Sequence, residues 1–292
     1  MIKAKHIKVP KSSTISEDVK IHCERFEVGE NCYIGKGVSI TCREFKAGDY
    51  LYMADRVEVG RGGCKGLRST VTIGDHVGIF EDTIINPSEP VTIGDNVGIG
   101  AEVMIWTHGA WLDIFEGFPS GFGPVEIGDN VWLPARSIVL PKVKIGSNSV
   151  ITINSIVNRD IPSGSLAGGN PAKVIREDVY PRELTEKQRK DLILEIVSSW
   201  NEILLYKVEN VSQKLSFYFD SKASSLTVSY KDSVCDVFLK EKPYTLQVLH
   251  TNGRDIEADT VFEDLRDYLR RRGLKIYNGK PFKSIEPKYL DF

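Results

Sequence analysis

The chain has 292 residues, which is room for two domains, and its formal net charge is only −2. This balance gives no indication of nucleic-acid binding or of attraction to a charged membrane surface, and no apolar run is long enough to span a bilayer. The first residues lack the apolar core of a signal peptide, and the five cysteines include no Cys-x2-Cys pair. We therefore expect a cytoplasmic protein with reduced thiols and no bound metal.

A six-residue period of aliphatic residues dominates the first part of the chain. From Ile127 to Val157 every sixth residue is aliphatic, and a small or β-branched residue stands two positions before each of them. The same spacing occurs in stretches that start at Val28, Ile73 and Ile93. A helix would repeat apolar residues every three or four positions, and a half-buried strand every two. A period of six fits a short strand followed by a turn, which is the repeating unit of a parallel β-helix.

Inserted segments interrupt this period. The longest separates Ile105 from Ile127 by twenty-two residues, and shorter insertions occur in the coils before it. Repeat proteins place insertions on their functional face, and loops held by a rigid scaffold often carry binding and catalytic residues. His108 stands at the root of the longest insertion, three residues after Ile105. We therefore expect the functional site at the loop 107–124.

The pattern changes after residue 162, where a run of Ser, Gly, Asn and Pro residues ends the repeat. Thr185 and Gln188 form a capping-box signal, and apolar residues at helical spacing continue to Leu204, which predicts a helix. Further expected elements are strands at 215–219, 226–230, 234–239, 246–249 and 274–277, and a helix at 261–272. The sequence thus predicts a mainly β protein, with a β-helix domain at 1–178 and a linker helix plus a small α+β domain at 179–292.

Several motifs of the repeat resemble a known family. They are Thr107-His108, the run Pro-Val-Glu-Ile-Gly-Asp-Asn-Val-Trp at 124–132, and the closing segments Asn-Arg-Asp-Ile-Pro at 158–162 and Ala-Gly-Gly-Asn-Pro-Ala at 167–172. Together they resemble the hexapeptide-repeat acyltransferases, most closely the maltose, galactoside and xenobiotic O-acetyltransferases, over roughly residues 20–178. The resemblance implies a left-handed β-helix, a homotrimer with active sites in clefts between adjacent subunits, and acetyl-CoA as cosubstrate.

The resemblance also places the family's catalytic histidine at His108. A neutral imidazole can remove the proton from an acceptor hydroxyl while the oxygen attacks the thioester, so no serine or cysteine nucleophile is needed. A backbone N–H of the coil is expected to bind the oxyanion. Glu81 or Asp82, in the preceding coil, is a candidate to orient His108, and Trp132 matches a family tryptophan beside the site. Each residue also has a structural interpretation: a loop histidine, surface acids, and a tryptophan that packs at a corner.

Coenzyme A is an extended anion, and the resemblance places it along the last coils. The residues expected to bind it, which are basic or belong to the last hexads, are Arg136, Asn154, Ser155, Arg159, Lys173 and Arg176. Arg159 stands where the family usually has lysine. Two departures bear on this path: the family's Trp-Ile-Gly is here Trp132-Leu133-Pro134, and its Ala-Gly-Ser is here Ile153-Asn154-Ser155. Each basic residue could instead be a solvated surface charge.

The function expected from the sequence is O-acetyl transfer from acetyl-CoA to a sugar hydroxyl, with a small-molecule or glycan acceptor. Alternatives are N-acetylation of an amino sugar or nucleotide sugar, and a non-catalytic β-helix scaffold. A zinc carbonic anhydrase on the same scaffold would need three converging histidines. The repeat offers only two near the site, His76 and His108, which disfavours this function. The C-terminal domain is expected to recognise the acceptor or to assist assembly.

Overall fold

The computed structural model describes residues 1–207, 216–230, 233–240, 244–250 and 256–286. The chain divides into two compact units, Met1–Arg182 and Glu183–Phe292, and each is considered by itself. The boundary expected at residue 178 falls just before this division. No helix in the described ranges is both long enough and apolar enough to cross a membrane.

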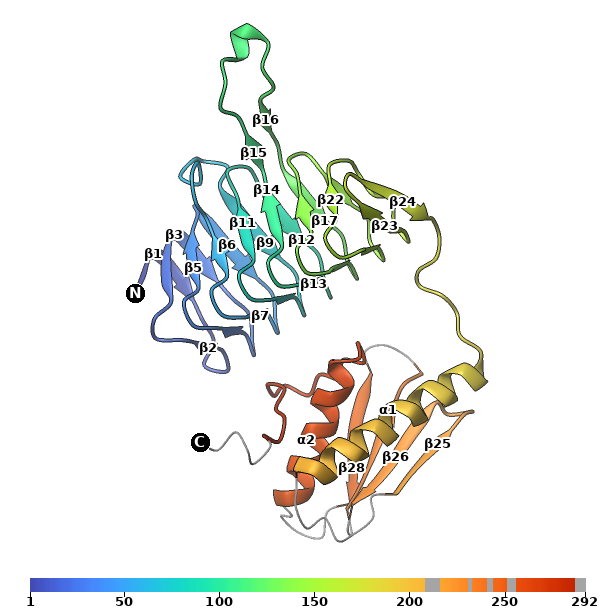
Figure 1. Cartoon of the computed structure of the whole chain (residues 1–292). Coiled ribbons are helices and arrows are strands. Elements are labelled where there is room, and N and C mark those ends of the chain that lie inside the picture. Colours follow the sequence, from blue (N-terminus) through green and yellow to red (C-terminus); the bar gives the residue numbers. More distant parts are fainter. Residues whose placement is uncertain (208–215, 231–232, 241–243, 251–255, 287–292) are drawn as a thin grey trace. The chain divides into compact units, whose positions relative to one another are not determined.

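Unit Met1–Arg182 is a parallel β-helix in which each strand pairs with the equivalent strand of the next coil (Figure 1). The first face contains β6 (Glu44–Ala47), β9 (Thr70–Ile73), β12 (Val91–Ile93), β17 (Val125–Ile127) and β20 (Lys144–Ile145). The second contains β2 (Thr14–Ile15), β4 (Tyr33–Ile34), β7 (Tyr52–Met53), β10 (Gly78–Ile79), β13 (Gly98–Ile99), β18 (Trp132–Leu133), β21 (Val150–Ile151) and β23 (Leu166–Gly169). The third contains β5 (Ser39–Thr41), β8 (Glu58–Val59), β11 (Ile84–Asn86), β14 (Met104–Trp106), β19 (Ile138–Val139) and β22 (Ile156–Val157).

Two elements lie outside this regular stack. At its start, β3 (Lys20–Glu27) bends from the third face to the first, because its first half pairs with β5 and its second half with β6. The first strand, β1 (Ile2–Lys8), runs parallel to β3. At the other end, β24 (Ala172–Arg176) turns back and pairs antiparallel with β23.

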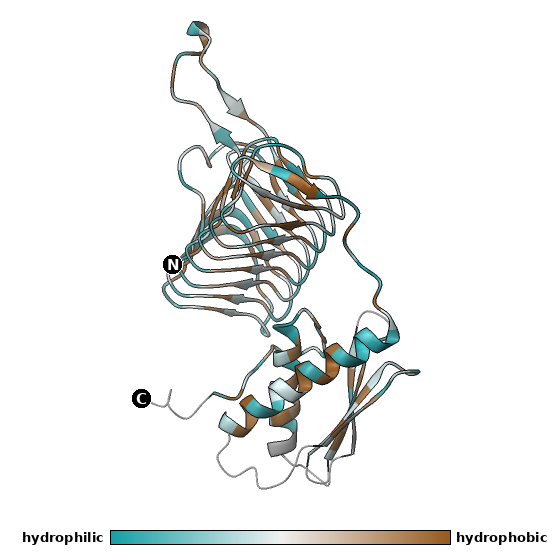
Figure 2. Ribbon diagram, turned by 45° about the vertical axis from the view of Figure 1, so that its right-hand side comes forward, coloured by the Kyte–Doolittle hydropathy of each residue, from teal (hydrophilic) through white to brown (hydrophobic). Residues whose placement is uncertain are grey.

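The aliphatic residues of the six-residue period fill the interior of this β-helix. All of those between Val28 and Val157 are at most 3% exposed. The small residues two positions before them, such as Val125 and Ser137, are also buried. Figure 2 shows the apolar colour on the strands of the stack and the polar colour at many of its turns. The prediction of a stacked core from the period is therefore confirmed.

A ladder of hydrogen bonds holds the corner between the first and second faces. Asp75 Oδ1 accepts the backbone N–H of Asp49 at 2.7 Å, one coil earlier. In the same way, Asp95 Oδ1 accepts the backbone N–H of Asp75 at 2.7 Å, and Asp129 Oδ1 accepts that of Asp95 at 2.8 Å. A glycine precedes each of these aspartates, because a Cβ at that position would collide with the next coil. At Gly94, for example, a Cβ would lie 2.2 Å from Asp129 Oδ1 and 2.9 Å from Asp129 N.

The ladder predicts that Gly94→Ala destabilises the β-helix. The added methyl group would force Asp129 and its backbone apart from the preceding coil, and such overpacking costs about 2 kcal/mol. Gly66→Ala is the matched control, because a Cβ there meets no atom within 4 Å. Urea denaturation followed by circular dichroism measures both variants. Equal midpoints for Gly94→Ala and the wild type would contradict the steric role of this glycine.

In its described residues, unit Glu183–Phe292 contains two helices and an antiparallel sheet. Helix α1 (Glu186–Lys207) is followed by β25 (Ser216–Asp220), β26 (Ser225–Tyr230), β27 (Ser233–Phe238), β28 (Thr245–His250) and α2 (Ile256–Arg270). The four strands pair in chain order. The capping box is present: Thr185 N donates to Gln188 Oε1 at 3.0 Å, and Gln188 N donates to Thr185 Oγ1 at 3.2 Å. Residue 215, expected to begin the first strand, lies outside the described residues.

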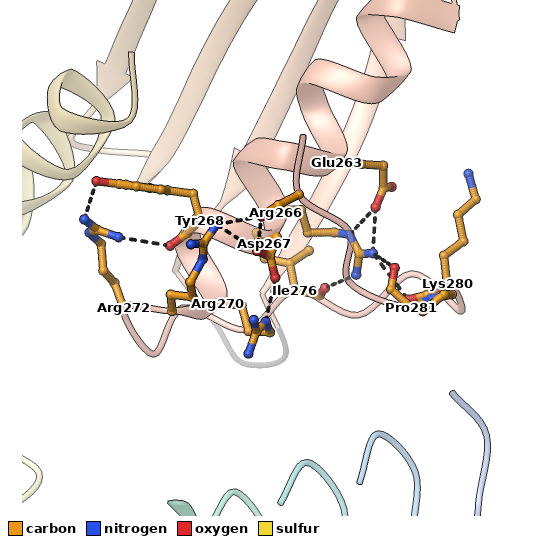
Figure 3. A network of polar contacts seen from close by, with 11 residues as sticks. Glu263, Arg266, Asp267, Tyr268, Arg270, Arg272, Ile276, Lys280 and Pro281 are labelled. Atoms are coloured by element: carbon orange, nitrogen blue, oxygen red, sulfur yellow. Dashed lines mark hydrogen bonds and ion pairs between the residues drawn. The ribbon is translucent and has the colours of Figure 1, made fainter. Parts of the chain in front are cut away.

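Two expectations for this unit need correction. The second helix begins earlier than expected, at Ile256. The expected strand 274–277 is reduced to a single bridge between Ile276 and Tyr244. The reason is that Arg266, a fully buried residue of α2, donates to the carbonyl oxygens of Ile276 at 3.1 Å and Pro281 at 2.7 Å (Figure 3). A buried guanidinium requires such partners, so this segment is held by a side chain rather than by a sheet.

Candidate active site

The insertions of the repeat all lie at one corner, between the third and first faces. Segment 60–69 follows β8, segment 87–90 follows β11, and segment 107–124 follows β14. Because β8, β11 and β14 are neighbours on the third face, the three segments leave the stack at adjacent coils. This corner is therefore the most elaborated part of the β-helix.

The longest insertion forms a hairpin that projects from the stack (Figure 1). Strand β15 (His108–Gly109) pairs antiparallel with β16 (Gly121–Phe122), and a 3-10 turn, η1 (Ile114–Glu116), lies near the tip. The hairpin exposes aromatic side chains: Trp111 is 95% exposed and Phe115 is 96% exposed. It is closed at its base, where Gly123 N donates to the carbonyl oxygen of Thr107 at 3.0 Å.

His108 is half-buried at the base of the hairpin, and its Nδ1 lies 2.9 Å from Oδ1 of Asn86. Asn86 is completely buried at the end of β11, in the preceding coil. Its Nδ2 donates to the backbone carbonyls of Gly60 at 2.9 Å and Gly62 at 3.1 Å. These two bonds fix the amide, since only the NH2 group of asparagine can donate to a carbonyl.

The fixed amide determines which tautomer the neutral imidazole adopts. Asn86 presents its acceptor oxygen to His108, so Nδ1 must carry the hydrogen and donate it. In the neutral ring Nε2 then keeps its lone pair and can accept a proton. A buried neighbour that orients a histidine through Nδ1 is the arrangement used by histidine general bases. The geometry therefore suits His108 for proton abstraction.

Aromatic rings and a glycine-rich segment surround this imidazole. Phe122 stacks on it with ring centroids 5.6 Å apart, and Trp106 meets it edge-on at 6.4 Å. On the side of the preceding coils, a Cβ on Gly63 would lie 3.7 Å from His108 Cε1. Cys64 is buried next to Gly63, and burial raises the pKa of its thiol to about 11. A thiol with that pKa stays protonated near neutral pH, so it is not an activated nucleophile.

Glu81 and Asp82 do not orient His108, which corrects the expectation for these two acids. They follow β10 and lie at the corner between the second and third faces, whereas His108 follows β14. Asp82 is exposed and accepts two hydrogen bonds from Arg56, at 2.8 and 2.7 Å. The Arg56 guanidinium also lowers the pKa of the Asp82 carboxyl below its ordinary value. The partner of His108 is Asn86, a neutral residue that the sequence analysis did not select.

Trp132 also lies apart from His108 within one chain. It is in β18 on the second face and covers Gly98 of the preceding coil, where a Cβ would lie 2.5 Å from the indole. The side chain is 42% exposed. Its contact with Gly98 lies on a face of the β-helix and not at a corner, where the structural interpretation had placed it.

Four of the residues expected to bind coenzyme A gather near the corner between the second and third faces. Arg136 and Asn154 occupy this corner in successive coils, and Asn154 N donates to the carbonyl oxygen of Ala135 at 3.1 Å. Ser155 is buried there, and its Oγ accepts the N–H of Gly169 at 3.0 Å. Lys173 is exposed on β24, opposite Gly168. Arg136 already forms hydrogen bonds with Glu102 at 2.9 and 3.2 Å.

Arg159 and Arg176 lie elsewhere. Arg159 is exposed after β22, at the corner that also carries the hairpin two coils earlier. Arg176 is exposed at the other end of β24 from Lys173, opposite Leu166. The predicted cofactor residues therefore do not form one cluster in a single chain.

The two repeat histidines are also separated. His76 lies between β9 and β10, at the corner between the first and second faces, with its ring 5.2 Å from that of Tyr50. Among the described residues, no three His, Cys, Asp or Glu side chains gather as metal ligands. His76 and His108 thus cannot converge on one zinc ion within this β-helix.

Comparisons with known proteins agree with the repeat. A family model for the hexapeptide repeat of succinyl-transferase matches residues 90–110 and 124–159. A Saccharomyces cerevisiae protein assigned to the acetyltransferases is 41% identical over 125 residues, which are 42% of this chain and 63% of that protein. The galactoside O-acetyltransferase of Escherichia coli is 50% identical over 54 residues, which are 18% of this chain and 27% of that enzyme. The repeat of this chain is thus similar to the hexapeptide repeats of acetyltransferases.

The likeness to these hexapeptide-repeat acyltransferases is confined to part of each molecule. The chain spans less than two thirds of the length of the two relatives. A crystal structure of a hexapeptide-repeat acetyltransferase from Vibrio cholerae, complexed with acetyl-CoA, is 31% identical, covers 42% of this chain and 64% of that chain, and has a TM-score of 0.36. The matched segments of the family model contain the base of the hairpin and His108.

Proposed function

We propose that this chain is a coenzyme A-dependent O-acetyltransferase that moves an acetyl group from acetyl-CoA to a sugar hydroxyl, with His108 as the general base. The hydrogen bond between His108 Nδ1 and Asn86 Oδ1 carries the proposal, because it leaves Nε2 free to accept a proton. Support also comes from the names of the relatives, which are acetyltransferases, one of them a galactoside O-acetyltransferase.

In this reaction His108 Nε2 takes the proton of the acceptor hydroxyl while the hydroxyl oxygen bonds to the thioester carbonyl carbon. The tetrahedral adduct then breaks its C–S bond, and the imidazolium returns the proton to the departing coenzyme A thiolate. Asn86 Oδ1 accepts the Nδ1–H bond throughout, so the ring keeps its orientation when it becomes charged.

The assembly proposed for this activity is a homotrimer of left-handed β-helices in the cytoplasm. Within one chain, His108 lies at a different corner from Arg136, Ser155 and Lys173. A cleft between two copies would bring these corners together, with the acetyl donor bound across the interface. The exposed outer surface of Trp132 is available to such a cleft.

Acetyl transfer by the full chain tests this function. Purified protein is mixed with acetyl-CoA and a panel of glycosides and amino sugars, and release of free coenzyme A thiol is measured. We expect thiol release that depends on the acceptor and a product ester that alkaline hydroxylamine cleaves. A hydroxylamine-stable product would indicate N-acetylation instead. Absence of both turnover and coenzyme A binding by calorimetry would favour the scaffold alternative.

A further inference from the structure

The segment 60–69 is a basic wall beside His108. It carries Arg61, Lys65 and Arg68 and contains no acidic residue. Its backbone is tied to the site, because the carbonyls of Gly60 and Gly62 accept hydrogen bonds from the Asn86 side chain and Gly63 approaches the imidazole. The start of this segment is therefore hydrogen-bonded to the residue that orients His108.

Arg68 is held in place by a buried carboxylate. Its Nη2 lies 2.6 Å from Glu89 Oε1, and the Glu89 side chain is 9% exposed whereas that of Arg68 is 72% exposed. Glu89 is itself positioned by its backbone N–H, which donates to Thr107 Oγ1 at 2.9 Å, next to His108 in the chain. This hydrogen bond uses one of the five N–H donors of the guanidinium, and most of the side chain faces solvent. Arg68 is thus oriented in advance for a further acceptor.

The two other cations of the segment differ in their pairing. Arg61 forms an ion pair with Glu58 at 2.8 Å. Lys65 is exposed, and among the described residues no carboxylate lies within ion-pair distance of it. Because Arg61 places both Nε and Nη2 on Glu58, Lys65 and Arg68 are the cations of this wall least committed to a partner within the chain.

We infer that the acceptor carries an anionic group, a phosphate or a carboxylate, which Arg68 and Lys65 bind while its hydroxyl lies at His108. This inference rests on the proposed O-acetyltransferase function. The imidazole faces Asn86 and Gly63, which belong to the two preceding coils, so the basic wall lies on that side of the base. The residues proposed for coenzyme A lie in later coils, on the opposite side along the axis. The wall therefore serves the acceptor, and guanidinium and ammonium groups are the usual partners of such anions.

Matched acceptors test the inference in the wild-type protein. Each hexose or N-acetylhexosamine is supplied as its neutral methyl glycoside, as its 1-phosphate and as its uronate, and kcat/KM is measured at fixed acetyl-CoA. We expect the charged member of at least one set to be preferred by 10-fold or more, with the preference falling as salt is added. Turnover with no preference in any set would overturn the anionic acceptor while leaving the proposed function intact. No turnover at all would count against both.

Charge-altering variants separate recognition from folding. Lys65→Glu and Arg68→Gln should each lower the ratio of kcat/KM for the charged acceptor to kcat/KM for the neutral glycoside at least 10-fold, without raising KM for acetyl-CoA. Lys36→Glu, at an exposed lysine on another corner, is the matched control and should behave as wild type. An equal loss for charged and neutral acceptors would overturn the assignment. So would a rise in KM for acetyl-CoA alone, since the wall would then bind coenzyme A phosphates.

Discussion

His108→Ala should lower kcat for acetyl transfer by about 10²- to 10⁴-fold, the usual contribution of a general base. Alanine leaves no group near Asn86 Oδ1 that can take the hydroxyl proton, so the acceptor must react as the poorly nucleophilic alcohol. The acidic limb of the pH–rate profile should also disappear, because the group whose protonation stops the reaction is gone. Thiol release measured across pH gives both quantities.

The control for this variant is His22→Ala. His22 is exposed on β3, in an early coil, and its loss should leave turnover unchanged. The two variants should also share the wild-type circular dichroism spectrum, since neither side chain fills the aliphatic interior. Turnover of His108→Ala within about threefold of wild type would remove the general-base role.

Asn86→Leu and Asn86→Asp form the second large-effect prediction. Both lose the bonds from Nδ2 to the carbonyls of Gly60 and Gly62, so both loosen segment 60–69, and the aspartate carboxylate in addition repels these carbonyl oxygens. Leucine also removes the acceptor for His108 Nδ1–H, and the ring is then free to take the wrong tautomer. We expect kcat to fall by about 100-fold or more in Asn86→Leu, and by less in Asn86→Asp.

The pH profile distinguishes a positioning role from a structural one. A carboxylate in place of the amide would stabilise the imidazolium, so His108 would stay protonated to higher pH. The acidic limb of the Asn86→Asp profile should therefore move to higher pH than that of the wild type, and Asn86→Leu should show no such shift. Identical profiles and identical losses in the two variants would mean that Asn86 acts only by holding the segment.

The sequence allowed the interior of the β-helix and the location of His108 to be predicted, but not the partner of the histidine. Regular spacing reports which side chains point inward, because each coil repeats the same steric requirement. To identify the partner, one must also know which corner of the β-helix each residue occupies. His108 follows Ile105 by three positions, and the equivalent corner one coil earlier follows Ile85, not Ile79. Asn86, directly after Ile85, meets that condition, whereas Glu81 and Asp82 follow Ile79.

Glu81 and Asp82 were predicted as partners because they are charged, and this criterion was wrong here. A carboxylate is the commonest partner sought for a catalytic histidine, but a buried carboxylate beside carbonyl oxygens would be strongly unfavourable. The pocket formed by Gly60 and Gly62 requires a donor on one side and an acceptor on the other, which an amide supplies. The apolar run at 274–277 also led to a wrong prediction of a strand. Within this run the Arg266 side chain donates to the carbonyl oxygen of Ile276.

The aspartate ladder gives the β-helix a direction. Each carboxylate accepts a backbone N–H from the coil before it. The hydrogen bonds at the corner of one coil are therefore completed only by the coil that follows. Loss of coils from the N-terminal end would remove donors and leave every remaining corner satisfied. Loss from the C-terminal end would leave the new last coil without its acceptor. During synthesis, the corner of each coil can therefore complete these hydrogen bonds only after the next coil has been made.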